Sequence, residues 1–376
     1  MEQKKIVVAS DSFKGTLTSL DICCLFHTKT SKNSSIFPIF LPIADGGEGS
    51  LEAISNATDG RFELLEATKL YFQKMRTRFF VDEENNAYIE TASVVGLGLA
   101  RKDNNPGLVT TFGLGEQIKK AIDLGIKNIY LFLGGSASND GGVGLASALG
   151  VKFYDENDKP FIPTGLSLKK IKRIDNKEAL KTLEGINLVA LSDVASPFYG
   201  IEGAAYKFGP QKGATPEQVK ELDDNLRYLS DLIKRDLNKD ISTTPGSGAA
   251  GGLGGGLVGL LNASIKSGIN TLLDLIHFDE YIADADYVVS GEGKFDKQTL
   301  DGKVIDGVAK RCLKANKPLI IVVGISELSL EEIQKIYPCV TALYETNKEH
   351  LPYEKIKGNA KNDYLKVVGQ VLEDII

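Results

Sequence analysis

Carboxylates, lysines and small hydroxyl side chains recur beside glycines in this chain, at the points where short apolar runs end. The densest example is residues 290–304, Ser-Gly-Glu-Gly-Lys-Phe-Asp-Lys-Gln-Thr-Leu-Asp-Gly-Lys-Val, directly after the apolar run at 287–289. We expect a strand to end there and a turn to follow. In such a turn glycines let backbone N–H groups approach a phosphate, a lysine offsets its charge, and carboxylates hold Mg²⁺. The alternative is a polar loop that binds nothing, since loops at strand ends are commonly polar.

At least four more glycine turns repeat this design. Together with residues 290–304 they supply the candidates Asp11, Lys14, Asp45, Glu48, Ser136, Ser138, Asn139, Asp140, Asp193, Lys212, Gly291, Glu292, Gly293, Lys294 and Asp296. Phosphoryl transfer needs these residue types: lysines and backbone N–H groups bind phosphates, carboxylates hold Mg²⁺, and one carboxylate accepts the proton of the acceptor hydroxyl. No nucleophilic side chain is required. The pattern therefore favours a phosphotransferase.

Several common catalytic and metal-binding motifs do not occur in the sequence. The three histidines, His27, His277 and His350, lie outside the glycine turns, which argues against a Ser-His-Asp triad and against a histidine metal site. Gly302-Lys303 is followed by valine, so there is no P-loop motif, and the four cysteines lack the spacing of zinc ligands.

One G-x-G-x-x-G sequence occurs, formed by Gly246, Gly248 and Gly251. No predicted strand precedes it, and no acidic residue follows at the distance typical of dinucleotide-binding folds, so we do not interpret it as an NAD site. Two interpretations stay open. The glycines start a helix that cradles a phosphate, or they allow close packing of a helix.

Length and composition indicate a globular protein of two or three domains. The chain has 376 residues, of which 42% are hydrophobic and 25% charged. Lys and Arg total 44 against 50 Asp and Glu, a net charge of −6 without a basic cluster, which argues against nucleic acid as a partner. No apolar run reaches membrane-spanning length, and the first residues lead directly into a predicted strand. We therefore expect no signal peptide, no membrane association, a cytoplasmic location and reduced thiols.

Two styles of strand are predicted along the chain. The apolar runs at 4–9, 287–289 and 318–323 are typical of a parallel sheet that is covered on both faces. Between them, residues 62–67, 75–82 and 87–91 read as shorter strands, with a hairpin turn at residues 82–86.

These styles predict an α/β fold of two α/β domains, one inserted into the other: a Rossmann-like parallel sheet and a mixed-sheet inserted domain. We place the discontinuous domain at residues 1–60 and 285–376, and the inserted domain at residues 61–284. We expect the ligands to bind where glycine turns of both domains meet.

Two helix starts are also predicted. Ser19 is expected to cap a helix that continues to about residue 27. The sequence Thr215-Pro-Glu-Gln is a capping box with proline at the first helical position, and the helix that follows carries its apolar residues on one face.

Taken together, the motifs resemble those of the glycerate kinase family, the bacterial type-1 glycerate kinases. The similar stretches keep the family's order from residue 7 to about residue 305. They lie at residues 11–15, 42–49, 134–142, 192–194, 203–205, 208–214, 245–253, 290–296 and 298–299.

The resemblance implies ATP-dependent phosphorylation of D-glycerate with Mg²⁺, giving 2-phosphoglycerate. In this interpretation the catalytic residues are Asp45, Asp193 and Lys14, and the metal ligands are Glu292 and Asp296. Substrate or phosphate binding falls to Asp11, Ser136, Asn139, Lys212, Gly246, Gly248, Gly251, Gly291, Gly293 and Lys294. The oligomeric state is not readable from the sequence, and a homodimer is kept as one option.

Other interpretations stay open at this point. Asp45 could cap a helix, the lysines could be solvated, and Ser136 and Asn139 could merely satisfy a turn. The chain could be a glycerate 3-kinase, a kinase of another small hydroxy acid, or a non-catalytic cytoplasmic binder of hydroxy acids. A binder would need neither ATP nor Mg²⁺, and so many phosphate-type turns argue against it.

Overall fold

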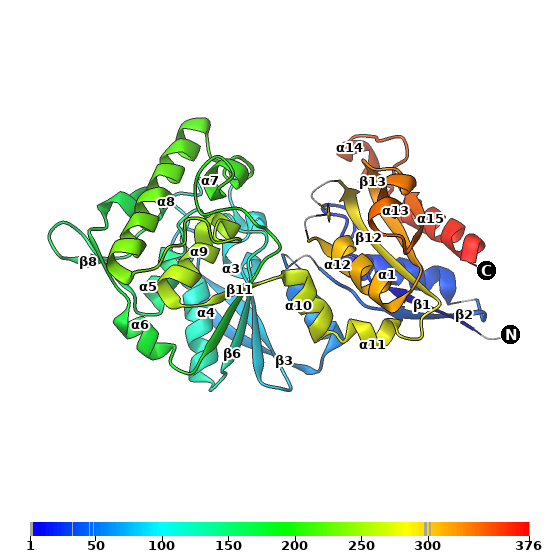
Figure 1. Cartoon of the computed structure of the whole chain (residues 1–376), viewed down its shortest axis with the longest axis horizontal. Helices are drawn as coiled ribbons and strands as arrows, with labels where there is room; N and C mark the ends of the chain where they lie inside the picture. Colours follow the sequence, from blue (N-terminus) through cyan, green and yellow to red (C-terminus); the bar gives the residue numbers. More distant parts are fainter. Residues whose placement is uncertain are drawn as a thin grey trace. The chain divides into compact units, whose positions relative to one another are not determined.

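The computed structural model describes residues 3–31, 33–44, 46–47, 49–296, 299–300 and 302–375, and it divides into two compact units. Unit 1 comprises Met1–Asp45, Glu52–Thr58 and Ile269–Ile376, and unit 2 comprises Gly46–Leu51 and Asp59–Gly268 (Figure 1). Residues 269–284, which we expected in the inserted domain, thus group with the C-terminal segment.

Helix packing explains why residues 269–284 belong to unit 1. A side chain at Gly307 would lie 2.6 Å from Ile269, so the two helices that carry these residues are in close contact. Arg311 also forms ion pairs with Asp274 and Asp279. Local sequence patterns indicate strands and turns, but they do not indicate which distant helices contact each other. The sequence therefore did not reveal that residues 269–284 belong to unit 1.

Unit 1 is built on a five-stranded sheet with the order β14-β13-β12-β1-β2, and every pairing is parallel. Counted along the chain this is the order 2-1-3-4-5, a doubly wound arrangement of the flavodoxin type. The strands are β1 (Lys4–Val8), β2 (Ile36–Phe40), β12 (Tyr287–Phe295), β13 (Leu319–Ser326) and β14 (Val340–Glu345). The first and last parts of the chain therefore share one parallel sheet, as predicted.

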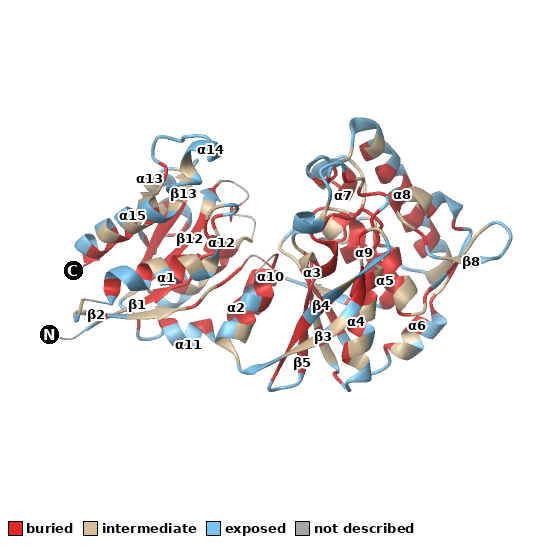
Figure 2. Cartoon of the chain, turned by 180° about the vertical axis from the view of Figure 1, so that it is seen from behind, coloured by how far each residue is buried: buried red, intermediate tan, exposed pale blue. Residues whose placement is uncertain are grey.

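Burial on both faces accounts for the apolar character of these strands. Ile6 and Val8 pack with α1 and α15 on one face, in one core cluster. Val7 between them is also fully buried, and it points to the opposite face because side chains alternate along a strand. Figure 2 shows β12 and β13 mostly in the colour of buried residues.

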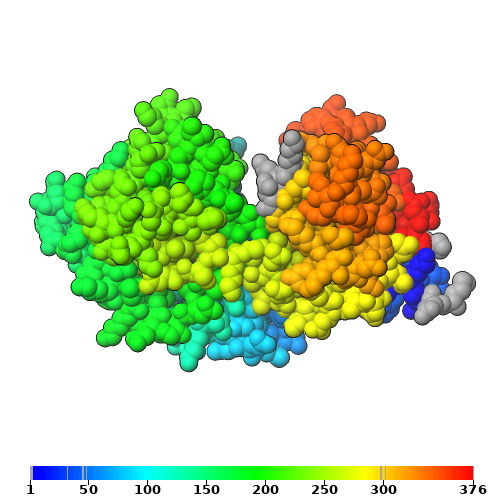
Figure 3. Space-filling model, in the orientation of Figure 1, coloured from blue at the N-terminus to red at the C-terminus, as the bar shows by residue number. Residues whose placement is uncertain are grey.

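The helices of unit 1 join and cover these strands. They are α1 (Ser19–Thr30), α11 (Phe278–Ile282), α12 (Val304–Ala315), α13 (Leu330–Ile336), α14 (Tyr353–Ile356) and α15 (Ala360–Ile375), together with most of α2 (Ser50–Ala57) and α10 (Gly268–Leu275). Helices α1 and α15 contact each other, so the N-terminal and C-terminal segments lie side by side in this unit, as the blue and red atoms in Figure 3 show.

Unit 2 is built on a mixed six-stranded sheet with the order β11-β10-β6-β5-β4-β3. The pairs among β11, β10, β6 and β5 are parallel, whereas β5-β4 and β4-β3 are antiparallel. The strands are β3 (Gly60–Lys69), β4 (Gln73–Asp82), β5 (Asn86–Glu90), β6 (Asn128–Phe132), β10 (Asn187–Leu191) and β11 (Ser264–Lys266), beside a small antiparallel sheet of β7 (Lys152–Tyr154), β8 (Pro160–Phe161) and β9 (Arg173–Asp175). The predicted mixed sheet is confirmed.

The helices of unit 2 include one whose start the sequence predicts in detail. Helix α8 (Pro216–Leu237) begins with the expected capping box between Thr215 and Gln218, and its predicted apolar face is buried. The others are α3 (Ala92–Val95), α4 (Phe112–Asp123), α5 (Val143–Ala148), α6 (Lys177–Thr182), α7 (Ala204–Phe208) and α9 (Ala249–Leu261), with the 3₁₀ turns η1 (Leu97–Leu99), η2 (Gly165–Lys170) and η3 (Pro210–Lys212).

Two local predictions were wrong. The strand expected to end at residue 289 continues as β12 to Phe295, because β13 pairs with it along the whole stretch and Gly291 permits the close approach. A side chain at Gly291 would lie 1.9 Å from the carbonyl oxygen of Val322. Helix α1 is capped by Thr18 instead of Ser19, in a capping box with Asp21.

None of the helices formed by the described residues is both long enough and apolar enough to cross a membrane.

Candidate active site

A pocket of unit 1 lies at the carboxyl ends of β1 and β12. From β1 the chain passes to β2 on one side of the sheet, and from β12 it passes to β13 and β14 on the other. Neighbouring strands whose connections leave in opposite directions open a crevice in which doubly wound proteins bind ligands. The pocket has a volume of about 290 Å³, and its lining includes Asp11, Lys14, Glu292, Lys294 and Lys303. Four of these five residues were predicted from the sequence.

Alternating charges surround this pocket. The Lys303 Nζ atom lies 3.9 Å from Glu292 Oε2 and 3.7 Å from Asp296 Oδ1. Lys294 Nζ lies 3.5 Å from Asp296 Oδ2 and 2.6 Å from Glu327 Oε1, and this pairing raises the pKa of Lys294. The two predicted metal carboxylates, Glu292 and Asp296, are thus brought together around one lysine.

The donor set is compatible with Mg²⁺. One or two carboxylates commonly hold this ion together with substrate phosphates. No group of three or more His, Cys, Asp or Glu side chains that could hold a metal occurs among the described residues. Glu292 and Asp296 therefore fit an ion that the phosphates of a nucleotide also bind.

The loop after β1 forms one wall of the pocket. Its backbone is tied to β12, since the Asp11 N–H donates to the Gly291 carbonyl at 2.9 Å. The Asp11 carboxylate accepts from the Ser12 N–H at 2.7 Å. Gly15 has a φ of +84°, and its carbonyl accepts a hydrogen bond from the Tyr353 hydroxyl at 2.9 Å. Asp11 is therefore held at the end of β1. The main-chain atoms of Gly291 take part in strand pairing and in this backbone hydrogen bond.

A second group of predicted residues lies in unit 2, at the carboxyl edge of its parallel strands. Asp193 follows β10, and its Oδ1 atom accepts a hydrogen bond of 2.6 Å from the hydroxyl of Ser267, which follows β11. The segment beside β6 completes this edge, since the Gly134 N–H donates to the Gly46 carbonyl at 3.0 Å. A side chain at Gly268 would lie 2.9 Å from Asp193 Oδ2 and 3.7 Å from the Cα atom of Gly46. Asp193 is thus an oriented carboxylate in a narrow, glycine-lined space.

Asp45 precedes Gly46 in the sequence, and both it and Glu48 lie outside the described residues. The neighbouring segment adds one carboxylate that the sequence did not reveal. Glu90, buried at the end of β5, accepts a hydrogen bond of 2.9 Å from the Gly49 N–H.

Lys212 is buried beside the glycine turn that follows β6. Its Nζ donates to the Ser136 hydroxyl at 2.9 Å and to the Ser138 carbonyl at 2.7 Å, with 4% of the residue exposed. Burial lowers the pKa of Lys212 to about 7, although the carboxylate of Asp140 opposes the shift. Asn139 beside them is fully buried, and neither its Nδ2 nor its Oδ1 atom has a hydrogen-bond partner among the described residues. The structure thus brings Ser136, Asn139 and Lys212 together.

The carboxylate of Asp140 is a structural group. It accepts hydrogen bonds from the Thr111 N–H and hydroxyl and from the Gly142 and Gly144 N–H groups. Burial raises its pKa despite these donors. This network holds the turn that carries Asn139.

The glycines of the G-x-G-x-x-G sequence mediate close packing. Side chains at Gly248 and Gly251 would lie 2.1 Å from the carbonyl oxygens of Pro197 and Ser138, respectively. Gly246 has a φ of +81°, and Ala250 shares the left-handed conformation with a φ of +54°. Of the two interpretations left open, the structure supports packing of α9 against the turns after β6 and β10.

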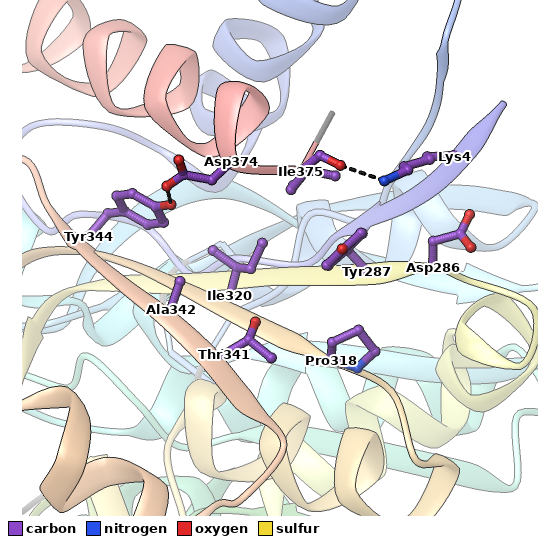
Figure 4. Close-up of a pocket in the computed structure, with 10 residues that line it drawn as sticks. All are labelled: Lys4, Asp286, Tyr287, Pro318, Ile320, Thr341, Ala342, Tyr344, Asp374 and Ile375. Atoms are coloured by element: carbon purple, nitrogen blue, oxygen red, sulfur yellow. Dashed lines mark hydrogen bonds between the residues drawn. The ribbon is translucent and has the colours of Figure 1, made fainter.

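A larger cavity of about 500 Å³ lies where strands β12, β13 and β14 of unit 1 begin (Figure 4). In it Tyr344 donates a hydrogen bond to Asp374, and Lys4 Nζ donates to the Ile375 carbonyl at 2.5 Å. None of the site residues predicted from the sequence is among the described residues that line it. We therefore assign the chemistry to the opposite, carboxyl ends of the strands.

Four residues were missed by the sequence reasoning. Lys303 was mentioned only because valine follows Gly302-Lys303, so that the P-loop motif is incomplete. A Gly-Lys pair before a helix is nevertheless itself an indication of a binding site. Glu90, Ser267 and Tyr353 stand outside the glycine clusters, and no motif marks them.

Carboxylates and lysines at the carboxyl ends of parallel strands, in two α/β units, define the class as α/β enzymes that act on small anionic ligands. The comparisons with known proteins give the family: the model of the glycerate kinase family matches residues 6–375. The chain is 41% identical over 326 residues to a glycerate kinase of Haemophilus influenzae, covering 85% of each chain. It is 37% identical over 326 residues to the glycerate 2-kinase of Escherichia coli, again covering 85% of each.

The fold agrees with this relationship. A crystal structure described as "putative glycerate kinase 2 from Salmonella typhimurium LT2" is similar with a TM-score of 0.82 and 34% identity, covering 100% of this chain and 98% of that one. The chain belongs to the glycerate kinase family.

Proposed function

We propose that this protein transfers the γ-phosphoryl group of ATP to a hydroxyl group of D-glycerate and forms 2-phosphoglycerate. The observation that carries the proposal is the edge of unit 2 at which Asp193 is held by Ser267, in a chain that matches the family model from residue 6 to 375. A fixed carboxylate beside glycine turns is what a kinase needs to orient and deprotonate an acceptor hydroxyl.

In the proposed reaction one bond to phosphorus forms while another breaks, and one proton is transferred. The glycerate hydroxyl donates its hydrogen bond to Asp193, and its oxygen forms a bond to the γ-phosphorus as the bond to the bridging β–γ oxygen breaks. ADP leaves with the bridging oxygen, and the proton passes to the carboxylate and then to solvent. The hydrogen bond from Ser267 occupies Oδ1 and so orients the carboxylate. Asp45 shares this catalytic role in our proposal.

Lys212 and Asn139 are the proposed anchor for the glycerate carboxylate. An anion close to a buried lysine stabilises its charged form, so substrate binding would raise the pKa of Lys212 from about 7 and draw a proton onto it. The unpartnered amide of Asn139 offers a further donor. Ser136, already bonded to Lys212, would orient the ammonium group.

Lys14, Asp11 and Lys294 complete the proposal as phosphate-binding and positioning groups, with Glu292 and Asp296 as the carboxylates that would hold Mg²⁺. When bound, this ion neutralises charge on the β- and γ-phosphates. We place the reaction in the cytoplasm, where ATP is available and cysteines stay reduced. A homodimer stays a prediction, which light scattering on the purified chain would test.

The test reads the product directly. The protein is incubated with Mg-ATP and D-glycerate, and the phosphomonoester is followed by proton-coupled ³¹P NMR. An ester at C2 is split by one proton into a doublet, whereas an ester at C3 gives a triplet. The relative named glycerate 2-kinase supports the doublet. A triplet would keep the kinase and overturn the position, and no ester would favour a non-catalytic binder.

A further inference from the structure

The pocket at the carboxyl ends of β1 and β12 is lined by two chemically different sets of side chains. Lys14, Lys294 and Lys303 lie among its lining residues, and Tyr353 and Ile356 of α14 line it as well. A three-carbon acid would have no use for the aromatic and aliphatic part. A nucleoside triphosphate has both an anionic chain and a flat apolar base, so it matches both parts.

The size of the pocket also favours a nucleotide. Its volume of about 290 Å³ is close to the lower limit of roughly 300 Å³ for small-molecule sites. This space exceeds what a hydroxy acid of three carbons fills. A nucleotide would occupy it and extend its remaining atoms into solvent.

Lys303 stands at a position where a cation is locally unfavourable. It is the N-cap residue of the twelve-residue helix α12, and its side chain makes no capping hydrogen bond within the part of the chain that the structure describes. The positive end of the helix dipole and the free N–H groups of the first turn favour anions there. Two carboxylates offset part of this cost, and the further lysines of the pocket make the surroundings of Lys303 suitable for an anionic ligand.

The lysine is also placed to move. Its side chain is 30% exposed, and its ammonium group is 3.7–3.9 Å from two carboxylates, too far for close ion pairs. Such long contacts hold a side chain weakly. Lys303 can therefore exchange these carboxylates for phosphate oxygens at little cost.

We propose that this pocket of unit 1 is the nucleotide site, with Lys303 and Lys14 contacting the phosphates and Tyr353 and Ile356 contacting the base. The inference rests on the proposed function, because it assigns one of the two substrates of that reaction to a place. Lys303 becomes a substrate-binding residue.

The experiment measures binding without turnover. Isothermal titration of the full chain with the non-hydrolysable analogue AMP-PNP and Mg²⁺, in the absence of glycerate, gives the affinity. Lys303→Ala should weaken binding at least tenfold, because one charge-assisted contact to phosphate is lost. Lys314→Ala is the matched control, since Lys314 is exposed in the last turn of the same helix, and it should bind like wild type.

A second pair of variants distinguishes contacts to the phosphates from contacts to the base. Inorganic tripolyphosphate has the anionic chain without the base, so Lys303→Ala should weaken its binding as well. Tyr353→Ala should weaken AMP-PNP but not tripolyphosphate, whereas Tyr353→Phe keeps the ring and should bind both normally. Circular dichroism checks that each variant is folded.

The outcomes distinguish this inference from the proposed function. Unchanged AMP-PNP affinity in folded Lys303→Ala would overturn the site, even if the NMR assay shows 2-phosphoglycerate. If no ester forms while AMP-PNP binds and Lys303→Ala weakens it, the nucleotide site stands and the glycerate kinase activity fails. Loss of tripolyphosphate binding in folded Tyr353→Ala would overturn the assignment of Tyr353 to the base.

Discussion

Both units have charged side chains near the carboxyl ends of parallel strands, but the burial and the hydrogen-bond partners of these side chains differ between the units. In unit 1 Lys294 and Lys303 are partly exposed, with side-chain exposures of 47% and 30%, and they contact carboxylates around an open pocket. In unit 2 Lys212 is buried, its hydrogen bonds go to Ser136 and Ser138, and its pKa is lowered to about 7. Exposed lysines keep their charge and can follow a flexible ligand, whereas a buried lysine is fixed in place and its charge depends on what binds.

In terms of the proposed function, this difference corresponds to two purposes for lysines that lie near the carboxyl ends of parallel strands. A polyphosphate needs several mobile cations, and a small acid that must present one hydroxyl needs a rigid anchor. If this comparison holds, substitutions at the buried edge of unit 2 should have large effects on turnover and on the pH dependence of stability. Substitutions at the exposed ion pairs of unit 1 should have small effects on stability.

The largest expected effect is at the carboxylates that we propose as catalytic. Asp45→Asn should lower turnover by a factor of roughly 10²–10⁴ with the fold intact, because the change removes a charge at nearly constant shape. Asp193→Asn should lie in the same range, and Ser267→Ala should cost less because it only releases the carboxylate that Ser267 orients. Steady-state kinetics measures all three variants. Activity of Asp45→Asn within about threefold of wild type would remove Asp45 from the proposed catalytic role.

The second prediction concerns pH and Lys212. The folded pKa of about 7 lies below the ordinary value of 10.5, so between these pH values the unfolded chain carries a proton that the folded chain lacks. Stability relative to Lys212→Met should therefore rise with pH from about 7 to about 10, approaching tenfold in the folding constant per pH unit. Urea unfolding of both proteins at several pH values measures this.

Lys294→Met is the control for that experiment. The pKa of Lys294 is raised by its hydrogen bond to Glu327, which is the opposite direction, so its small contribution should be present at neutral pH and lost only as the pH rises through the pKa. Parallel pH profiles for Lys212→Met and wild type would show that Lys212 is not perturbed in the folded protein.

A smaller effect is expected at the ion pair between Lys294 and Glu327. The two side chains are 47% and 53% exposed, so water and salt screen their attraction. Glu327→Gln should leave the unfolding midpoint unchanged within error, as measured by thermal unfolding followed by circular dichroism. A clear loss of stability would mean that this exposed ion pair does contribute to the stability of unit 1.

A small effect of stabilising sign is expected at Ala250. Its φ of +54° costs an alanine roughly 1–2 kcal/mol relative to a right-handed conformation, a cost that glycine avoids. Part of the gain is offset, because glycine is more flexible in the unfolded chain. Ala250→Gly should thus raise the unfolding midpoint by about one to two degrees. A lower midpoint would indicate that the methyl group packs favourably in the kinked start of α9.

Much of the fold follows from local sequence patterns. The apolar runs near both ends predicted a shared parallel sheet, because strands buried on both faces must be apolar throughout. The capping box at Thr215 predicted the start of α8 to the residue, since the cap depends only on neighbours three positions apart. The glycine turns likewise gave Asp11, Lys14, Glu292 and Lys294 as candidates, and these four residues line the pocket of unit 1.

Only the tertiary structure decided the remaining features. Pairing with β13 extends β12 through a stretch that reads as a turn, because strand hydrogen bonds between distant segments outweigh the local preference of Gly291 and Gly293. Burial lowers the pKa of Lys212, and burial depends on the packing around a residue, which its own sequence neighbours do not set. Ser267 lies next to Asp193 because β10 and β11 pair across more than seventy residues of chain. A contact of that range leaves no trace in either segment alone.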